Sequence, residues 1–312
     1  MPGHLGVLLM AYGSPSGLED VARYYAHLRA ARGSPPPSQE EVEELTERYR
    51  RIGGRSPLLE MTIRQARALE RELRARGREL KVYLGMRHSS PFIGEAVRRA
   101  REEGVSFLVA IALAPHYSRL SIGDYEQALR EAAQGPTGLE YDMVRSYHLH
   151  PLFLEAWRER VEAALKPLEE GERRGLHTLF TAHSLPEAIL RWGDPYPDQV
   201  LESARALAGL LGLRSWEVAY QSAGATGGRW LGPHLLERVR ALAREGRRTL
   251  LVVPLGFVSD HLEVLYDIDL EARGLAQSLN VKLLRPEMLN DSPTFIRALA
   301  DLVEERLRAR PR

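Results

Sequence analysis

The chain has 312 residues, 44% of them hydrophobic, which is enough for about two domains of roughly 150 residues and excludes disorder as the main state. Its 43 basic and 42 acidic residues leave a net charge of +1, too little for a general field that would hold nucleic acid or an anionic membrane. Cysteine is absent, which excludes disulfides, thiol catalysis and Cys-ligated zinc or iron–sulfur sites.

Strand-like apolar runs alternate with amphipathic helical runs along the chain. The eight predicted strands are 5–11, 80–86, 106–113, 139–145, 176–182, 216–221, 249–255 and 280–284. This alternation is typical of βαβ units in a parallel sheet, so we predict an α/β fold with four strands in each half.

Capping signals mark several helix starts. Ser38 followed by Glu41 fits a capping box, and Ser56 stands before a proline at the start of a long helix that ends at Gly77. A helix over 148–165 is predicted to cross between the halves, and the polar stretch 165–175 to be a surface loop. We therefore divide the chain into domains 1–147 and 148–290, with the final helix, 291–312, packing back on the first domain.

Polar and aromatic residues gather where predicted strands end. Tyr12 follows the first strand and His183 follows the fifth, while His88 and His116 follow two others and are candidates for the cleft lining. Open α/β sheets bind ligands at the carboxyl ends of their strands, so this edge predicts a ligand cleft. Imidazole can accept a proton or bind a metal near neutral pH, which makes His183 a candidate general base or metal ligand.

A row of carboxylates follows the seventh strand. Glu263, Asp267 and Glu271 lie four residues apart on one face of a predicted helix that begins near Asp260. Asp260 and Glu263 also fit a capping box, but capping does not explain the two later acids. Like charges at this spacing repel, so the row favours a divalent cation passing along it.

The Gly-rich segment 223–230 follows a strand and raises the alternative of a phosphate-binding loop. It lacks both the G-x-G-x-x-G spacing and the lysine of a Walker loop, so a nucleotide site is the weaker interpretation. A loop that lets a large flat ligand approach the backbone fits the glycines equally well. Ser-His-Asp hydrolysis is also disfavoured, because no G-x-S-x-G elbow occurs.

Four segments together resemble the ferrochelatases, which insert ferrous iron into porphyrins. They are LMAYGSP at 9–15, IGGRSPL at 52–58, TAHSLP at 181–186 and GFVSDHLEVLYD at 256–267. The resemblance runs from about residue 5 to the final helix. It implies two similar Rossmann-like domains, each a four-stranded parallel sheet with helices on both faces, and a porphyrin cleft between them.

The resemblance also implies roles for individual residues. His183 and Glu263 would be the catalytic residues and would face each other across the macrocycle as the metal-handling and proton-handling pair. Asp267 and Glu271 would be the outer metal path. The segment at 9–15 is similar to the coproporphyrin III branch, in which Tyr12 would lie on the other face of the macrocycle and ligate iron in the product. Family positions that would hold the porphyrin propionates are Arg29, Arg48, Tyr49, Ser56 and Tyr125.

The expected function is therefore insertion of Fe²⁺ into coproporphyrin III during haem biosynthesis, with iron as a substrate and no permanently bound cofactor. Protoporphyrin IX as substrate is the nearest alternative; a cobalt chelatase and a non-catalytic haem or tetrapyrrole binder are more distant ones. The longest apolar run, 5–12, is far shorter than the ~20 residues of a membrane span. We expect a cytoplasmic monomer without a stable membrane anchor or a nucleic-acid partner; transient contact with neighbouring haem-pathway enzymes stays open.

Overall fold

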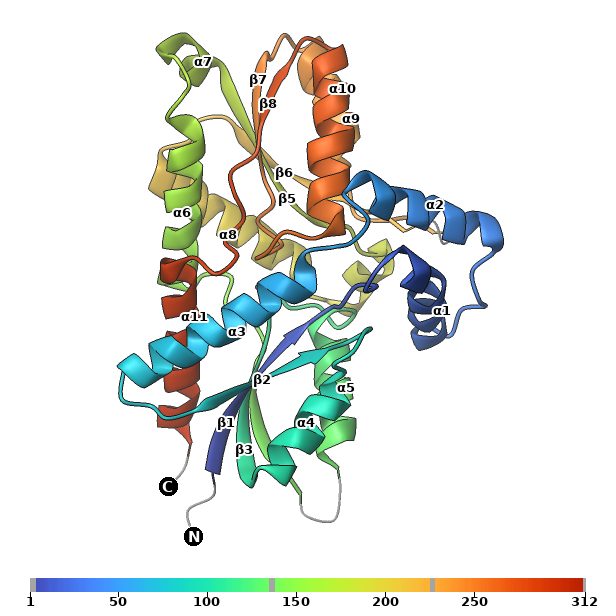
Figure 1. Cartoon of the computed structure of the whole chain (residues 1–312). Helices are drawn as coiled ribbons and strands as arrows, with labels where there is room; N and C mark the ends of the chain where they lie inside the picture. Colours follow the sequence, from blue (N-terminus) through green and yellow to red (C-terminus); the bar gives the residue numbers. More distant parts are fainter. Residues whose placement is uncertain (1–3, 135–137, 225–227, 311–312) are drawn as a thin grey trace.

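Two four-stranded parallel sheets form the framework of the chain (Figure 1). The computed structural model describes residues 4–134, 138–224 and 228–310. The first sheet has the order β2-β1-β3-β4 and the second β6-β5-β7-β8. The strands are β1 His4–Ala11, β2 Lys81–Met86, β3 Val105–Ala112, β4 Glu140–Val144, β5 Leu176–His183, β6 Trp216–Gln221, β7 Thr249–Val253 and β8 Lys282–Leu284. All eight predicted strands, four in each half, are confirmed, and so is the predicted fold class.

Most strand boundaries lie within one residue of the prediction, and the two that differ by two residues do so for backbone reasons. β7 ends at Val253 because the next residue, Pro254, has no N–H to donate to a neighbouring strand. β8 begins at Lys282, two residues later than predicted, because Asn280 has φ of +54° in the left-handed region, which a strand cannot contain.

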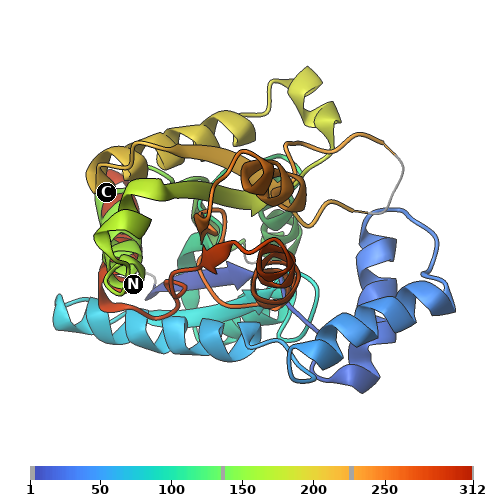
Figure 2. The same cartoon turned by 90° about the horizontal axis from the view of Figure 1, so that it is seen from above.

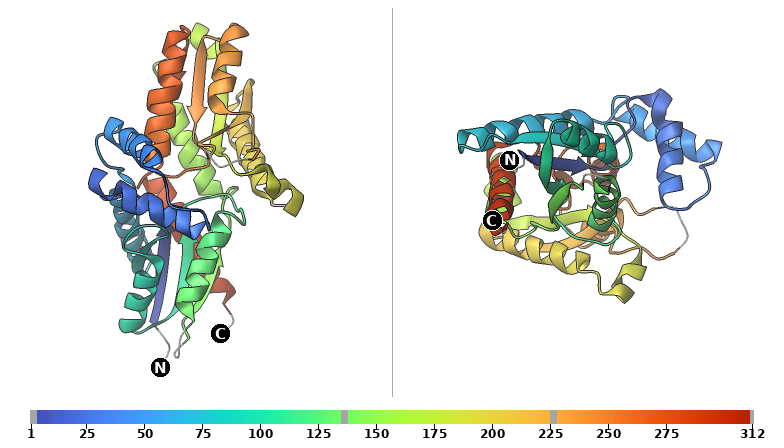
Figure 3. Two further views of the ribbon diagram at one scale, coloured as in Figure 1. Left: turned by 90° about the vertical axis from the view of Figure 1, so that its right-hand side faces the viewer. Right: turned by 90° about the horizontal axis from the view of Figure 1, so that it is seen from below.

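Helices cover both faces of the two sheets. Those of the first half are α1 Val21–Ala31, α2 Gln39–Arg51, α3 Leu58–Ala75, α4 Ile93–Glu102 and α5 Ile122–Ala133, with a short 3₁₀ turn η1 Leu18–Asp20. Those of the second half are α6 Pro151–Leu165, α7 Glu170–Gly175, α8 Tyr196–Leu211, α9 Leu235–Arg244, α10 Arg273–Ser278 and α11 Pro293–Ala309, with a 3₁₀ segment η2 Glu187–Trp192 and a π-helix η3 Val264–Ala272. In Figures 2 and 3, α1 and α2 project to one side of the sheets.

The helix starts follow the capping chemistry of the sequence. Ser38 accepts a hydrogen bond from the Glu41 N–H, and the Glu41 side chain accepts one from the Ser38 N–H, so the predicted capping box is confirmed. The predicted loop over 165–175 was wrong in its second half. There Glu169 and Glu172 form a similar reciprocal cap, which allows the six residues of α7 to close a helix.

A continuous hydrophobic core joins the two halves. It contains residues of both sheets and of helices from both halves, among them Leu69 of α3, Trp157 of α6 and Phe295 of α11, all fully buried. Because these side chains pack into one cluster, the separation of the two sheets is set by apolar packing.

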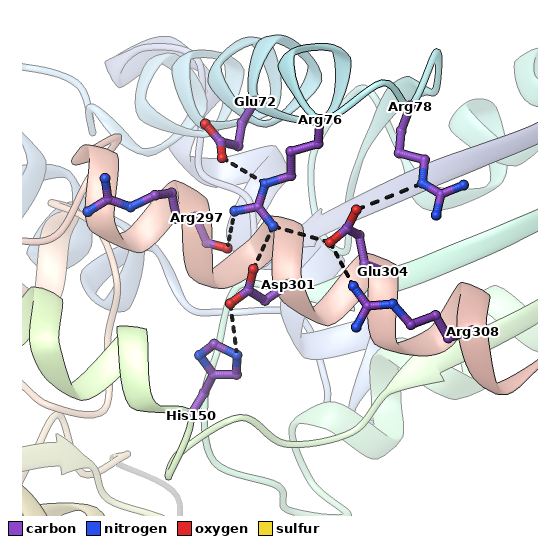
Figure 4. A network of polar contacts seen from close by, with 8 residues as sticks. All are labelled: Glu72, Arg76, Arg78, His150, Arg297, Asp301, Glu304 and Arg308. Atoms are coloured by element: carbon purple, nitrogen blue, oxygen red, sulfur yellow. Dashed lines mark hydrogen bonds and ion pairs between the residues drawn. The ribbon is translucent and has the colours of Figure 1, made fainter.

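Arg76 at the end of α3 forms the centre of a polar network on α11 (Figure 4). Its guanidinium donates to Glu72 at 2.8 Å, to Asp301 at 2.5 Å and to Glu304 at 3.4 Å. His150, just before α6, approaches Asp301 at 4.0 Å. The network fastens the last helix to the first half of the chain, and the two termini lie at the same end of the molecule (Figure 1).

Among the residues described, no helix has both the length and the apolar character needed to cross a membrane.

Candidate active site between the two sheets

The carboxyl ends of both sheets point toward the junction between the two halves (Figure 1). Tyr12 directly follows β1 of the first sheet, and His183 is the last residue of β5 in the second. Each of these strands has a parallel neighbour on both sides, so its end position is fixed by the sheet. The topology therefore brings residues 171 apart in sequence to one region.

His183 and Glu263 form the centre of the site, and the expectation that they face each other across a macrocycle was wrong, because their side chains are in contact and leave no room for a ring between them. The Nε2 atom of His183 lies 3.5 Å from Oε1 of Glu263, and both side chains are about one third exposed, at 30% and 31%. The Nδ1 atom of His183 contacts the carbonyl oxygen of Ser184. A carbonyl only accepts, so this contact places the proton of the neutral ring on Nδ1 and leaves the Nε2 lone pair facing Glu263.

Charge coupling separates the pKa values of this pair. Burial favours the neutral form of each group, but the attraction between them is stronger in its net effect. It raises the pKa of His183 above its usual value and lowers the pKa of Glu263 to about 2. The arrangement makes His183 a better proton acceptor and keeps Glu263 ionised beside it.

The peptide that carries His183 is held by hydrogen bonds on several sides. Tyr196 donates its hydroxyl to the His183 carbonyl at 2.8 Å, and the Ser184 N–H donates to the Gln221 carbonyl at 2.7 Å. The Ser184 hydroxyl donates to the Leu231 carbonyl at 2.8 Å. Because both carbonyls and the N–H of this dipeptide have partners, the imidazole is attached to a fixed piece of backbone.

Glu263 stands at the start of the π-helix η3, where the predicted α-helical cap was wrong. The Glu263 N–H donates to Nδ1 of His261 at 3.1 Å, so His261 takes the capping position. Asp260 instead accepts a hydrogen bond from the Asn290 side-chain N–H at 2.8 Å, and its backbone N–H donates to the Asn290 side-chain oxygen at 3.0 Å. Because Asp260 pairs with Asn290, 30 residues further along the chain, it does not cap the start of this helix.

A second contact fixes the outer side of η3. Arg285 donates to both carboxylate oxygens of Asp269, at 2.8 and 2.6 Å, and its guanidinium is only 12% exposed. A bidentate pair of this kind fixes orientation as well as distance. It therefore holds the helix that carries the carboxylate row against the loop after β8.

The carboxylate row continues outward from Glu263 to Asp267 and Glu271. Burial, followed by repulsion from Glu263, raises the pKa of Asp267 to about 7, although Ser222 and Arg48 oppose the rise. The Ser222 hydroxyl donates to Asp267, and Ser222 has φ of +59°, a strained backbone for a residue with a side chain. Binding of a cation or a proton to this row therefore reduces the repulsion between its carboxylates.

A cavity of about 340 Å³ opens onto the outer part of this row. Asp267 and Glu271 line it from η3, Ser222 from the segment after β6, and Arg48 from α2 of the first half. The Arg48 guanidinium also lies 5.2 Å from the ring centre of Tyr266 and is paired with Glu44 at 2.9 Å. The structure therefore places Arg48, a residue proposed for a propionate, beside the acidic row.

Tyr12 stands on the wall contributed by the first sheet, with its side chain partly exposed. Arg32 donates to its hydroxyl at 3.1 Å, and the His88 ring packs edge-on against it at 4.6 Å. Burial raises the pKa of Tyr12; Arg32 opposes the rise and the charge of Glu263 adds to it. Tyr12 follows β1 of the first sheet and Glu263 follows β7 of the second, so the two residues come from opposite halves of the chain.

The other residues proposed to bind the propionates differ in their burial and in the hydrogen bonds that they already make. Arg29 already donates to Glu41 at 2.8 Å and to the Pro35 carbonyl at 2.9 Å. Ser56 is buried, and its hydroxyl accepts from the Leu58 N–H at the start of α3. Tyr49 and Tyr125 are buried with raised pKa values, because burial disfavours their ionised forms and Glu263 and Tyr12 add to the effect.

The two further histidine candidates lie behind the exposed part of the site. His88 is 7% exposed behind Tyr12, and burial lowers its pKa to about 3. His116 is 2% exposed, and its Nε2 contacts the Ser203 hydroxyl at 2.7 Å between the two halves. Of the Gly-rich segment, residues 225–227 lie outside the described part of the chain.

Three residues of the site carried too little signal in the sequence. Ser222 follows β6 directly, so the strand-end rule indicates it, but nothing local predicts its left-handed φ or its contact with Asp267. Arg32 and Tyr196 lie outside the quoted motifs, and their importance comes only from the atoms they contact, Tyr12 Oη and the His183 carbonyl.

Comparison with known proteins shows one family over nearly the whole chain. The family model described as ferrochelatase matches residues 4–307. A ferrochelatase of Deinococcus radiodurans is 42% identical over 97% of this chain and 96% of that protein. A coproporphyrin III ferrochelatase of Bacillus subtilis is 41% identical over 97% of this chain and 98% of that protein. The structure of Bacillus subtilis SirB with Fe³⁺ shares the fold at a TM-score of 0.57 and 15% identity, covering 97% of this chain and 95% of SirB.

Proposed function

The chain belongs to the ferrochelatase family, and from this premise we propose that it inserts ferrous iron into coproporphyrin III. As a ferrochelatase it is a lyase-type porphyrin metal chelatase. The observation that carries the proposed chemistry is the pair His183 and Glu263, 3.5 Å apart on one wall with Tyr12 on the other. Iron enters as a substrate, and the proposal requires no resident cofactor.

Metal insertion must remove two protons from the pyrrole nitrogens, because the free porphyrin carries two N–H groups and the product carries none. His183 would accept these protons one at a time through Nε2, the nitrogen that is free in the neutral ring because Nδ1–H donates to the Ser184 carbonyl, and would release each proton before accepting the next. Glu263 would stabilise the imidazolium, since its pKa of about 2 keeps it ionised near neutral pH. The residues supply a base with a fixed orientation and a counter-charge.

The acidic row provides a route between His183 and solvent. Asp267 has a pKa raised to about 7, so it can take up and release a proton close to neutral pH, and it shares a cavity with Glu271. In the proposal Fe²⁺ arrives along these hard oxygen ligands and protons leave along them. Tyr12, on the opposite wall, would meet the product iron from the other face.

Two considerations support coproporphyrin III over protoporphyrin IX as the substrate. Relatives from Bacillus and Geobacillus that are named coproporphyrin III ferrochelatases are 41% identical over nearly their full lengths. Coproporphyrin carries four propionates and protoporphyrin two, so it needs more cationic donors around the site. Arg32 and Arg51 supply them: within the described residues neither guanidinium has an ion pair, and each donates only to a tyrosine hydroxyl, of Tyr12 or Tyr266.

A direct comparison of the two porphyrins tests this proposal. Purified protein is supplied with ferrous iron in the absence of air, and insertion into coproporphyrin III and protoporphyrin IX is followed by absorbance. We expect kcat/KM to be at least about tenfold higher for coproporphyrin III, the factor produced by about 1.4 kcal/mol of differential binding in the transition state. Equal values, or a preference for protoporphyrin IX, would reject the substrate while leaving the ferrochelatase assignment in place.

A further inference from the structure

Tyr196 makes a contact that the insertion chemistry does not use. It is the first residue of α8 and is only 6% exposed, with its ring edge-on to His116 at 6.2 Å. Its hydroxyl donates to the His183 carbonyl at 2.8 Å. The hydroxyl therefore acts on the backbone of His183 and leaves the imidazole free for other contacts.

Asp194 connects Tyr196 to the other half of the molecule. One of its carboxyl oxygens accepts from the Tyr196 N–H at 3.1 Å. The other accepts from the Ser118 hydroxyl at 3.0 Å and from the Arg119 N–H at 2.8 Å. Asp194 and Ser118 are both buried. The hydrogen bonds at the Tyr196 N–H and at its hydroxyl are thus joined by the buried Tyr196 side chain, and together they connect Ser118 to the carbonyl of His183.

The far end of this chain of hydrogen bonds belongs to the sheet that carries Tyr12. Ser118 lies in the loop after β3, and β3 pairs directly with β1, which ends just before Tyr12. Immediately beyond the paired residues, the Leu113 N–H still donates to the Met10 carbonyl at 2.8 Å. Ser118 and Tyr12 are therefore positioned by the same pair of strands. Through Asp194 and Tyr196, that pair also constrains His183 on the opposite wall.

We propose that Tyr196 and Asp194 are positioning residues that hold His183 at a set distance from the wall carrying Tyr12. A porphyrin between the walls needs both faces contacted at once, and a misplacement of about 1 Å at a reacting group costs up to about a hundredfold in rate. The buried hydrogen bonds supply that precision without touching either substrate. This inference rests on the role proposed above for His183.

Tyr196→Phe tests the inference because it removes only the hydroxyl and keeps the ring. We expect kcat for iron insertion to fall about tenfold, the effect of losing one buried hydrogen bond in the transition state. The KM values for porphyrin and iron, and the absorbance change on porphyrin binding, should stay at their wild-type values. A loss of fold would instead lower porphyrin binding together with kcat. An unchanged kcat, or a porphyrin KM that rises in proportion, overturns the proposal.

Tyr147→Phe is the matched control. Tyr147 is also a buried tyrosine near the junction of the two halves, 4% exposed, and its hydroxyl has no hydrogen-bond partner among the described residues. The same atom is therefore deleted from a similar environment without breaking a contact to His183. We expect wild-type kcat and KM from this variant; a fall equal to that of Tyr196→Phe would show that any buried hydroxyl here matters and would overturn the specific role.

Ser118→Ala tests whether the constraint reaches across the two halves. It deletes the hydroxyl that donates to Asp194, from a residue that contacts neither His183 nor Tyr196 in the described contacts. If the contacts act as one chain, the double variant with Tyr196→Phe should lose little more than the larger single loss. Losses that multiply independently would contradict a shared path.

The variant His183→Ala separates this inference from the proposed function. With the imidazole gone, adding Tyr196→Phe should cause no further loss of insertion. If His183→Ala keeps wild-type insertion, the role of His183 fails and the inference fails with it. If His183→Ala is inactive but Tyr196→Phe is fully active, only the inference fails.

Discussion

At the scale of single residues, the site depends on which nitrogen of one ring carries a proton. The carbonyl of Ser184 can only accept, so it holds the His183 proton on Nδ1 and directs the basic Nε2 toward Glu263. Burial alone would make this imidazole a weaker base, and the ionised Glu263 reverses that effect. The basicity of His183 at Nε2 therefore depends on Ser184, which fixes the tautomer, and on Glu263, which raises the pKa.

His183→Ala should separate porphyrin binding from iron insertion. The variant loses the proton acceptor but leaves the walls of the site unchanged, so we expect the dissociation constant for porphyrin to stay within about threefold of wild type. The rate of insertion should fall by at least about a hundredfold, as is usual for removal of a general base. Absorbance titration gives the first quantity and anaerobic steady-state kinetics the second.

His177→Gln provides the control for this change. His177 lies at the opposite end of the same strand, where it contacts the Ser215 hydroxyl at 2.7 Å and Glu217 at 3.2 Å. Its replacement disturbs β5 without touching the site, so insertion should be retained. If His183→Ala loses binding and insertion in equal measure, the residue supports the structure of the wall and is not the base.

Sequence reasoning located the residues that lie in motifs and missed those that act through distant contacts. His183 and Glu263 stand out because they follow buried strands at the edge where ligands bind. Tyr196 differs: an aromatic residue at the start of a helix indicates burial, and nothing local tells that its hydroxyl meets a carbonyl 13 residues away. Information of that kind exists only after the halves have packed.

At the scale of elements, the strands were easy to predict and the helix of carboxylates was not. Strands buried on both faces give continuous apolar runs, as in β7, where all five residues are buried. Side chains four residues apart return to nearly the same face both in an α-helix of 3.6 residues per turn and in a π-helix of roughly 4.4. The spacing of Glu263, Asp267 and Glu271 therefore indicates a row but cannot tell the winding of η3. In the structure, η3 is held by contacts with residues distant in sequence, such as the pair of Arg285 with Asp269.

The row itself can be tested by removing its outer charges. In the variant Asp267→Asn, Glu271→Gln both outer ligands become neutral, so the attraction for Fe²⁺ along η3 should weaken. We expect the KM for iron to rise about tenfold while the KM for porphyrin changes little, since divalent cations prefer carboxylate oxygens. Initial rates at varied iron concentration measure the effect.

Glu237→Gln is the control that distinguishes the row from the cavity. Glu237 lines the same 340 Å³ cavity from α9, and its replacement removes a charge without changing η3. An iron KM that rises as much as in the row variant would mean that the total charge of the cavity governs metal affinity. No dependence on either change would remove the pathway.

At the scale of the whole molecule, the two halves meet through a buried polar seam near α8. The His116 imidazole contacts the Ser203 hydroxyl there, and Gln199 accepts from both the Tyr117 N–H and the Ser146 hydroxyl. These contacts cross between the first sheet and α8, and they are additional to the apolar core that the halves share. The relative placement of the two halves therefore depends on these hydrogen bonds as well as on apolar packing.

The seam should make the protein sensitive to acid. Burial, with a smaller effect of His148, lowers the pKa of His116 from 6.5 to about 3. A lowered pKa means that the unfolded chain binds the proton first, so this stability is fully present above pH 6.5 and is lost as the pH falls toward 3. Each pH unit in that window should cost about 1.4 kcal/mol of unfolding free energy.

His116→Asn tests this linkage by urea denaturation at pH 7 and pH 5. The variant starts less stable at pH 7 because it loses packing and a fitted contact. Between the two pH values, however, its unfolding free energy should drop by about 2 kcal/mol less than that of the wild type. Equal drops in the two proteins would show that His116 does not titrate on unfolding.

The helix α11 imposes an order on how the newly made chain can be completed. It is made after all the other helices described, yet it packs on α3 and on the first sheet, where Arg76 binds Asp301 and Glu304. The nascent amino-terminal half therefore emerges with an apolar surface that stays uncovered until residues 293–309 have been made. Domains generally fold as they are translated, but this one has to wait for residues 293–309, and a stop codon just before them would leave both halves unfinished.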